Sequence, residues 1–387
     1  MAAITVLTSV HAPYDVRIFH RECRALRAAG HEVTLVAPAG FAREERDGIT
    51  LLGVRRPRRR LGRPLVWWRL FQQVRRLRPD VVHFHDPELL LLVPLLRLAL
   101  GRRVRLVYDV HEYFRDALAV KHWIPRRLRP AVAWLAGRLE RLLVRGVDAL
   151  VLAVDGQRPL YGSFRGPIAV VRNLPAAALF ADPRPHPALD GPGFRLIYVG
   201  LIMPQRGTDV LLEALRRLHD EGARDVVLFL IGPETSPAYM RQIESFCREH
   251  GLAEQVRWLG PVPPDQLQHY LANADAGVAT GLYTAQYTRP SIFTKLFEYM
   301  LAGLPVLAAD YPWSRTFVEE STCGLLVRGD DAAAYAGAIR WLRDHREEAR
   351  AMGRRGREMV LDHYTWEQEQ ERLVKLYREL QIVNRKS

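Results

Sequence analysis

The sequence has few cysteines and no arrangement of them that implies a cross-link. Its 387 residues include three, and Cys23, Cys247 and Cys323 lie far apart, with no C-x-x-C pair and no neighbouring histidine at ligand spacing. This pattern excludes a disulfide framework and a structural zinc site. A reducing, cytoplasmic setting therefore fits the sequence best.

Long hydrophobic runs are also missing. The longest apolar run covers residues 89–96 and is interrupted by Pro94, whereas a membrane-spanning helix needs about 18 apolar residues. No basic region precedes the first apolar residues, so we expect no signal peptide. Hydrophobic residues make up 48% and charged residues 26% of the chain, which is typical of a globular protein that builds its own core.

Strand-like and helical patterns alternate through the first half of the chain. The expected strands are 4–8, 32–36, 49–54, 81–85, 104–108, 149–154 and 168–172. Several are apolar throughout, as in parallel sheets that are buried on both faces. This order predicts a doubly wound α/β domain. No G-x-G-x-x-G fingerprint follows the first strand, so dinucleotide binding of the dehydrogenase kind is not expected.

The alternation stops at residues 173–194, which are rich in proline, glycine and alanine, and then resumes. The second set of expected strands is 195–200, 226–231, 256–259, 277–279, 305–308 and 324–327. We predict an N-terminal domain over 1–175, a C-terminal domain over 176–360 and a final helix over 361–387 that returns to the first domain. Because ligands bind at the carboxyl ends of such strands, we expect the active site in a cleft between the domains.

The most specific segment is 291–308, SIFTKLFEYMLAGLPVLA. It resembles the nucleotide-sugar signature of family 4 glycosyltransferases, which have the GT-B architecture of two Rossmann-like domains. Three upstream segments support the resemblance: LIYVG at 196–200 with QRG at 205–207, LIGP at 230–233, and VRWLGPV at 256–262. The resemblance implies a retaining transferase that uses a nucleotide diphosphate sugar.

The resemblance also implies donor-binding residues. Glu298 corresponds to the ribose-binding second glutamate of the family's Glu-x7-Glu pair, but Pro290 stands where the first glutamate is expected. The family's two phosphate-binding cations correspond to Leu201 and Arg206, so one is missing, and Lys295 is expected to supply it. Gly200, Gly207 and Thr294 complete the expected phosphate-binding set. A capping carboxylate at Glu298 and a solvated Arg206 are the structural alternatives.

Polar residues follow two strands of the first domain. His111, in YDVHE, resembles the family histidine beside the donor sugar, and we expect His85 and Asp86, in HFHDPE, to contact the acceptor. Loop-stabilising roles are the alternative. The H-x-H pair with an aspartate also suggests a metal, but no third ligand is well spaced, so none is expected. Asp15 and Arg17 either face the cleft or act as a helix cap and an outer-face residue.

Positive charge is concentrated in the first half of the chain. Residues 1–145 carry a net charge of +15, whereas the rest carries −2. Ten arginines and no acidic residue occur in 48–79. Arg58, Arg59 and Arg60 precede a helix with Trp67, Trp68 and Phe71, which is typical of a helix on an anionic membrane surface. The alternative is that these aromatic residues pack in the core. No nucleic-acid module accompanies the charge, so nucleic acid is not expected as a partner.

Together these features predict a glycosyltransferase of polysaccharide biosynthesis in the cell envelope. It would transfer a sugar from a UDP- or GDP-sugar to a lipid-linked or cell-surface polysaccharide acceptor, peripherally on the inner face of the cytoplasmic membrane. No Asp-x-Asp pair occurs, so the metal clamp of the other main glycosyltransferase architecture is not expected, and neither is any cofactor. A sugar-nucleotide epimerase of the same architecture and a catalytically idle membrane-associated partner protein are the alternatives.

Overall fold

The computed structural model describes residues 1–55, 62–119, 121, 124–282 and 292–380. The chain forms two compact units: unit 1 contains Met1–Asn173 and Gln368–Ser387, and unit 2 contains Leu174–Glu367. The described helices include none that is long and apolar enough to cross a bilayer.

Unit 1 is built on an eight-stranded sheet in the order β3-β4-β2-β1-β5-β6-β7-β8. Its strands are β1 (Ala3–Leu7), β2 (Glu32–Pro38), β3 (Arg43–Arg46), β4 (Ile49–Val54), β5 (Val81–Phe84), β6 (Arg105–Val110), β7 (Ala149–Leu152) and β8 (Ile168–Val170). All pairs are parallel except β3 with β4. Parallel order brings the carboxyl ends of β1, β5 and β6 to one edge, where the residues that follow them meet.

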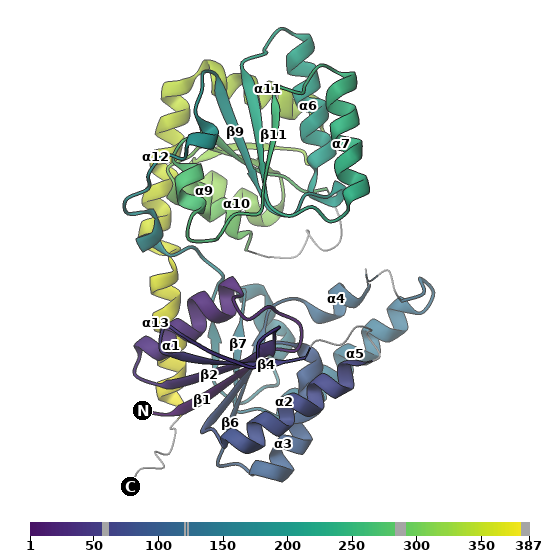
Figure 1. Cartoon of the computed structure of the whole chain (residues 1–387), viewed down its shortest axis with the longest axis vertical. Coiled ribbons are helices and arrows are strands. Elements are labelled where there is room, and N and C mark those ends of the chain that lie inside the picture. The colour runs from purple at the N-terminus through teal and green to yellow at the C-terminus, as the bar shows by residue number, and fades with distance from the viewer. Residues whose placement is uncertain (56–61, 120, 122–123, 283–291, 381–387) are drawn as a thin grey trace. The chain divides into compact units, whose positions relative to one another are not determined.

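The helical segments of unit 1 cover this sheet (Figure 1). They are η1 (Val16–Cys23), α1 (Arg24–Ala28), α2 (Arg63–Leu77), η3 (Pro87–Leu92), α3 (Val93–Leu100), α4 (Phe114–Ala119), α5 (Arg129–Leu143), η4 (Val144–Gly146), η5 (Asp155–Tyr161) and α13 (Trp366–Glu379). Tyr377 of α13 is fully buried, and its hydroxyl lies 2.7 Å from His83 Nδ1. The last helix is therefore part of the core of unit 1.

Unit 2 has a six-stranded parallel sheet in the order β11-β10-β9-β12-β13-β14. Its strands are β9 (Phe194–Val199), β10 (Val226–Ile231), β11 (Val256–Gly260), β12 (Ala276–Ala279), β13 (Val306–Ala309) and β14 (Gly324–Val327). Its helical segments are η6 (Ala177–Phe180), η7 (Pro187–Leu189), η8 (Pro204–Arg206), α6 (Thr208–Asp220), α7 (Pro237–Glu249), α8 (Leu267–Leu271), α9 (Thr294–Leu301), α10 (Pro312–Ser321), α11 (Ala332–Asp344) and α12 (Arg346–His363).

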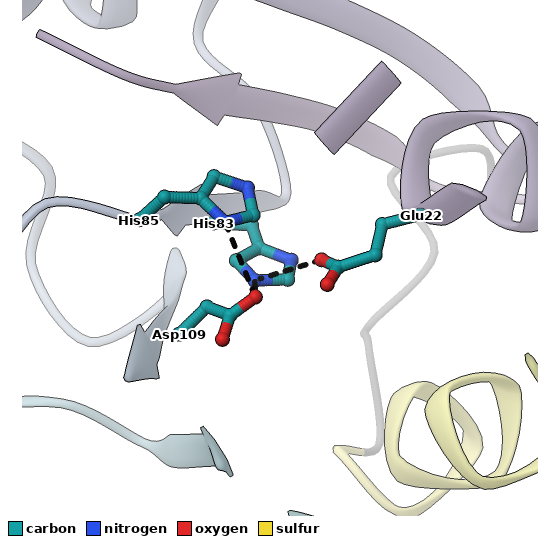
Figure 2. A group of neighbouring side chains, drawn as sticks. All are labelled: Glu22, His83, His85 and Asp109. Atoms are coloured by element: carbon teal, nitrogen blue, oxygen red, sulfur yellow. Dashed lines mark ion pairs between the residues drawn. The ribbon is translucent and has the colours of Figure 1, made fainter. Parts of the chain in front are cut away.

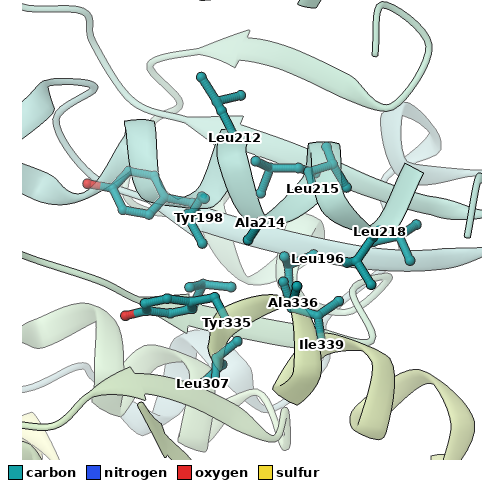
Figure 3. Packing of buried hydrophobic residues seen from close by; sticks show 14 of the residues in the cluster. Leu196, Tyr198, Leu212, Ala214, Leu215, Leu218, Leu307, Tyr335, Ala336 and Ile339 are labelled. Carbon is teal, nitrogen blue, oxygen red and sulfur yellow. The ribbon is translucent and has the colours of Figure 1, made fainter. Parts of the chain in front are cut away.

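The core of unit 2 lies on both faces of the sheet. On one face, Leu212 and Leu215 of α6 and Ile339 of α11 pack with Leu196 and Tyr198 of β9 (Figure 3). On the other face, α9 contributes buried residues to a second cluster. Each fully buried leucine side chain contributes roughly 1.5–3 kcal/mol. These two layers therefore hold β9, which leads into the loop of Gly200, and α9, which carries Lys295 and Glu298, in fixed positions.

Candidate donor and acceptor sites

Two glycines shape the loop at the carboxyl end of β9. Gly200 has φ +140° and Gly232 has φ +138°, and a Cβ on Gly232 would lie 2.0 Å from the Gly200 carbonyl oxygen. The loop continues to Gly207, at φ +77°, where α6 begins. A glycine-bounded loop that leads into a helix N-terminus exposes backbone N–H groups and the positive end of the helix dipole, an arrangement that suits a phosphate.

Lys295 lies directly behind this loop. Its side chain is buried, its Nζ has no hydrogen-bond partner among the described residues, and Nζ lies 4.1 Å from the centre of the Tyr198 ring. A Cβ on Gly200 would lie 3.7 Å from this Nζ. Burial, with Arg206 adding to it and Glu298 opposing it, holds the pKa of Lys295 well below its usual range. A buried amine without a partner is costly, and an anion on the loop would give it one.

Glu298 is half-buried on α9, which begins at Thr294 and has no side-chain cap at its start. The next residue, Tyr299, holds α9 against the sheet. Its hydroxyl accepts a hydrogen bond from Val199 N of β9 (2.8 Å) and donates one to the Val278 carbonyl of β12 (3.2 Å). Unit 2 thus holds Gly200, Arg206, Gly207, Lys295 and Glu298 on elements that meet at one edge of the sheet. Leu201 is exposed, and Pro290 lies outside the described residues.

A buried ion network occupies the corresponding edge of unit 1. The Arg17 guanidinium donates to both carboxylate oxygens of Asp109, from Nη2 to Oδ1 at 3.0 Å and from Nε to Oδ2 at 3.1 Å, and its Nε lies 2.9 Å from Glu22 Oε1. Burial would raise the pKa of Asp109, but Arg17 and His111 hold it well below its usual range. Burial and the Asp109 charge raise the pKa of Glu22 well above its usual range.

Four fully buried side chains of this network have the composition of a metal site. Donor atoms of Glu22, His83, His85 and Asp109 all lie within 4.8 Å of one another (Figure 2). However, Arg17 already lies against both carboxylates. A metal ion bound by these oxygens would stand next to a guanidinium, and repulsion between the two cations opposes that. The residues present therefore fit an ion pair with Arg17 better than a metal.

The structure distinguishes the predicted acceptor residues by exposure. His85 is fully buried, with Nδ1 3.2 Å from Asp109 Oδ2 and 2.9 Å from His111 Nε2, so it can orient His111 but cannot itself contact an acceptor. His111 is partly exposed, at 19% of its side chain. Asp86 lies at the same edge and is also buried, with 5% of its side chain exposed. Its Oδ2 accepts a hydrogen bond from Thr8 Oγ1, whereas Oδ1 accepts none from the described residues.

In the first loop, the structure agrees with one of the two expectations for Asp15 and with neither of those for Arg17. Asp15 caps η1, because its Oδ1 accepts hydrogen bonds from Arg17 N (2.9 Å) and Ile18 N (3.0 Å). Arg17 points inward, into the buried network, and not to the outer helix face. The sequence prediction missed His11, whose Nδ1 lies 3.3 Å from Asp15 Oδ2 and whose Nε2 lies 3.6 Å from Asp86 Oδ1. The four-residue spacing of His11 and Asp15 was the available signal.

The predicted membrane helix is only partly exposed. Phe71 is buried in the core of unit 1, so the prediction that it faces a membrane was wrong. Trp67 is half-buried and donates its Nε1 hydrogen to Glu88 (3.1 Å), whereas Trp68 is exposed. Trp68 and Phe71 are three residues apart on α2, and their ring centres are 5.4 Å apart, so the exposed Trp68 ring packs at the edge of the buried Phe71. Arg58, Arg59 and Arg60 lie outside the described residues.

Comparisons with known proteins identify both halves of the chain. The model of the group 1 glycosyl transferases matches residues 182–359, and the model of the glycosyl transferase 4-like domain matches residues 16–177. A D-inositol 3-phosphate glycosyltransferase of Nocardia farcinica is 35% identical over 161 residues, 41% of this chain and 34% of that protein. The match to its Geodermatophilus obscurus counterpart covers 39% of that protein. The chain thus spans little more than a third of these relatives' length.

A longer match and two solved structures cover more of the chain. The GDP-mannose-dependent alpha-(1-6)-phosphatidylinositol monomannoside mannosyltransferase of Mycobacterium tuberculosis is 27% identical over 292 residues, 72% of this chain and 70% of that protein. The structure of sucrose-phosphate synthase from Thermosynechococcus elongatus has a TM-score of 0.77 at 20% identity and covers 98% of this chain and 99% of its own. Anabaena HepE, solved with UDP-glucose, has a TM-score of 0.72 at 15% identity, with coverages of 98% and 100%.

The structural likeness establishes the fold: two Rossmann-like domains in the GT-B architecture, as predicted. The two family models identify the family, because one matches the larger part of unit 1 and the other matches the larger part of unit 2. The chain belongs to the family 4 glycosyltransferases.

Proposed function

We propose that the protein is a retaining glycosyltransferase that transfers a sugar from a UDP- or GDP-sugar to an acceptor hydroxyl. The observation that carries the proposal is Lys295, a buried amine without a hydrogen-bond partner among the described residues, behind the Gly200 loop. Arg206 and Glu298 lie on elements at the same edge of the sheet. Two cations can bind the two phosphates of a diphosphate, and a carboxylate can accept hydrogen bonds from the hydroxyls of a ribose.

In this proposal each donor residue has a distinct task. Glu298 accepts hydrogen bonds from the ribose hydroxyls. Arg206, Lys295 and the N–H groups at the start of α6 bind the diphosphate, and they stabilise the negative charge that develops on it as the glycosidic bond breaks. Thr294, at the start of α9, would extend this set. Because these cations are part of the chain, we expect donor binding without a metal ion.

Unit 1 would bind the acceptor. His111 and Asp86 lie at the carboxyl ends of its strands. The buried His85 and Asp109 contact His111, and Thr8 and Ser9 donate hydrogen bonds to Asp86. The relatives' names specify inositol phosphate and a phosphatidylinositol mannoside. These names support an acceptor with a polyhydroxyl ring on an anionic or lipid carrier, in line with the lipid-linked or cell-surface polysaccharide acceptor that the sequence predicts.

We also propose that unit 1 binds an anionic membrane surface from the cytoplasmic side, mainly through α5. Large apolar residues are exposed at spacings of four and three along this helix and at the residue that precedes it, which places them on one face: Leu128, Val132, Leu135, Leu139 and Leu142. Exposed arginines flank them: Arg126, Arg127, Arg138, Arg141 and Arg145. The single acidic residue in 124–146 is Glu140, and it is engaged by the hydroxyls of Tyr108 and Tyr161.

A nucleotide titration tests the donor site. Calorimetry of the full chain with UDP and GDP should show saturable binding of one nucleotide that EDTA does not change. Glu298→Ala should weaken that binding at least tenfold, about 1.4 kcal/mol, with the melting temperature unchanged. Glu348→Ala, an exposed glutamate on α12, is the matched control and should bind as wild type does. Equal affinity in wild type and Glu298→Ala would contradict the assignment.

A further inference from the structure

His11 and His111 form the accessible rim of the buried network in unit 1. His11 follows β1 and His111 follows β6, and their ring centres are 5.2 Å apart. About a third of the His11 side chain is exposed, against none of the side chains of His83 and His85. His11 is therefore the histidine of this group that a ligand can reach most easily.

The carboxylate of Asp86 has one occupied and one available oxygen. Oδ2 accepts hydrogen bonds from the Thr8 hydroxyl (2.9 Å) and from the backbone N–H of Ser9. Oδ1 accepts none from the part of the chain that the structure describes, and it lies 3.6 Å from His11 Nε2, too far for a hydrogen bond. A ligand oxygen about 2.8 Å from both atoms would complete a triangle with normal hydrogen-bond lengths.

The protonation of His11 suits a hydroxyl group in that position. Burial lowers the pKa of His11, but the hydrogen bond to Asp15 and the charges of Asp86, Asp15 and Asp109 outweigh burial and raise it. A protonated His11 donates from Nδ1 to Asp15 and from Nε2 to the ligand oxygen. The ligand hydroxyl can then donate its own hydrogen to Asp86 Oδ1. Only a group that both accepts and donates satisfies the pair.

The surrounding charges disfavour an anion. Asp15, Asp86 and Asp109 lie around the rim, and Glu88 accepts hydrogen bonds from Ser9 and Arg63 close by. The guanidinium of Arg17 is already paired with Asp109 and Glu22. A fully ionised phosphate oxygen has no hydrogen to give to Asp86 and would meet like charge. The anionic carrier of an acceptor would therefore have to lie elsewhere.

We propose that His11 and Asp86 together bind a hydroxyl group on a neutral sugar or cyclitol ring, and that this pair selects the hydroxyl-bearing end of the acceptor over its phosphate. This inference rests on the proposed function, because it deepens the acceptor site described there. It assigns to His11 a direct contact with substrate.

Saturation-transfer NMR on the full chain tests the pair with matched probes. The neutral probes are methyl glucoside, methyl mannoside and myo-inositol, and each is compared with its monophosphate in the presence of saturating UDP or GDP. We expect saturation transfer to at least one neutral probe, and weaker transfer to its phosphate. His11→Gln should reduce the affinity for that neutral probe at least fivefold.

His31→Gln is the control, because His31 precedes β2 and lies at the opposite, amino end of the strands. It should bind the probe as wild type does. Preferential binding of the phosphates, an unchanged affinity in His11→Gln, or no transfer to any neutral probe would each overturn the inference. The nucleotide titration in the same samples separates the two claims: failure of UDP and GDP to bind would reject the proposed function, whereas nucleotide binding without polyol binding would reject this inference alone.

Discussion

At the scale of single residues, the buried charges of unit 1 show what the sequence could and could not reveal. The sequence indicates that His85, Asp86 and His111 follow strands, and the structure places them at one edge of the sheet. It does not reveal that Arg17 turns inward to Asp109, because helix period alone leaves a residue near a helix start free to face either side. Glu22 was missed because its contact with His83 of β5 joins two segments that lie far apart in the sequence.

Neutralising Asp109 and neutralising Glu22, the two carboxylates around Arg17, should have different effects on the free energy of unfolding. Asp109→Asn leaves a buried guanidinium without its bidentate partner and should lower the free energy of unfolding by about 3–5 kcal/mol at pH 7. Glu22→Gln should leave it unchanged within about 1 kcal/mol or raise it, since the raised pKa means that the ionised Glu22 is already disfavoured in the folded state. Urea unfolding of both variants measures the difference. A large loss in Glu22→Gln alone would contradict this assignment.

The pH dependence of the stability follows from the pKa shifts of Asp109 and Glu22. The pKa of Asp109 is lower in the folded state, so its contribution to stability is present above its usual value of 3.8 and is lost as the pH falls. The pKa of Glu22 is higher in the folded state, so its contribution is present below 4.5 and is lost as the pH rises. Glu22→Gln should therefore gain stability relative to wild type between pH 5 and pH 8. A constant difference over that interval would contradict the raised pKa.

We expect Lys295 to lower the stability of the nucleotide-free protein and to strengthen nucleotide binding. Its folded-state pKa is lowered, so the charged amine disfavours folding increasingly as the pH falls. Lys295→Met, of similar length and without charge, should raise the melting temperature of the nucleotide-free protein at pH 7. It should also weaken UDP or GDP binding at least tenfold. Thermal unfolding and calorimetry on the same variant check both effects, and a variant that is less stable yet binds normally would refute the role.

At the scale of elements, the pattern of apolar residues was sufficient to predict the buried strands but not the exposed strand β3. The expected strands of both units were found, whereas β3, which has the sequence REER at residues 43–46, has no apolar signal. It forms because Asp47 and Gly48 adopt positive φ (55° and 70°), the conformation of a tight hairpin turn. The helix α2 was predicted, but which of its aromatic residues pack inward depended on the neighbouring β4 and η3.

The exposed stripe of α5 should bind anionic vesicles. Replacing Leu135, Leu139 and Leu142 by glutamate removes apolar contact and adds negative charge, so vesicle binding should fall at least tenfold. Flotation with vesicles that contain anionic lipid, at low and high salt, measures it. Leu361→Glu, an exposed leucine on α12 of unit 2, is the control. Equal flotation of wild type and the triple variant, or equal flotation with neutral vesicles, would contradict the proposal.

At the scale of the whole molecule, the order of strands and helices was enough to predict two Rossmann-like units. The signature around Glu298 was enough to predict the family, because its residues are adjacent in sequence and turn from a helix into a strand. The acceptor side was less predictable, because its residues come from three segments that only the folded sheet brings together. Thr8 and His11 follow β1, Asp86 follows β5 and Asp109 lies in β6.

The most direct test of the account is sugar transfer itself. Purified protein is incubated with UDP- and GDP-sugars and anionic vesicles that carry extracted envelope lipids, and release of the nucleotide diphosphate and the anomeric configuration of the product are measured. We predict release that depends on the acceptor, tolerates EDTA and is lost in Glu298→Ala, with a product that retains the donor's anomeric configuration. Release without any acceptor, an inverted product, or full activity in Glu298→Ala would contradict it.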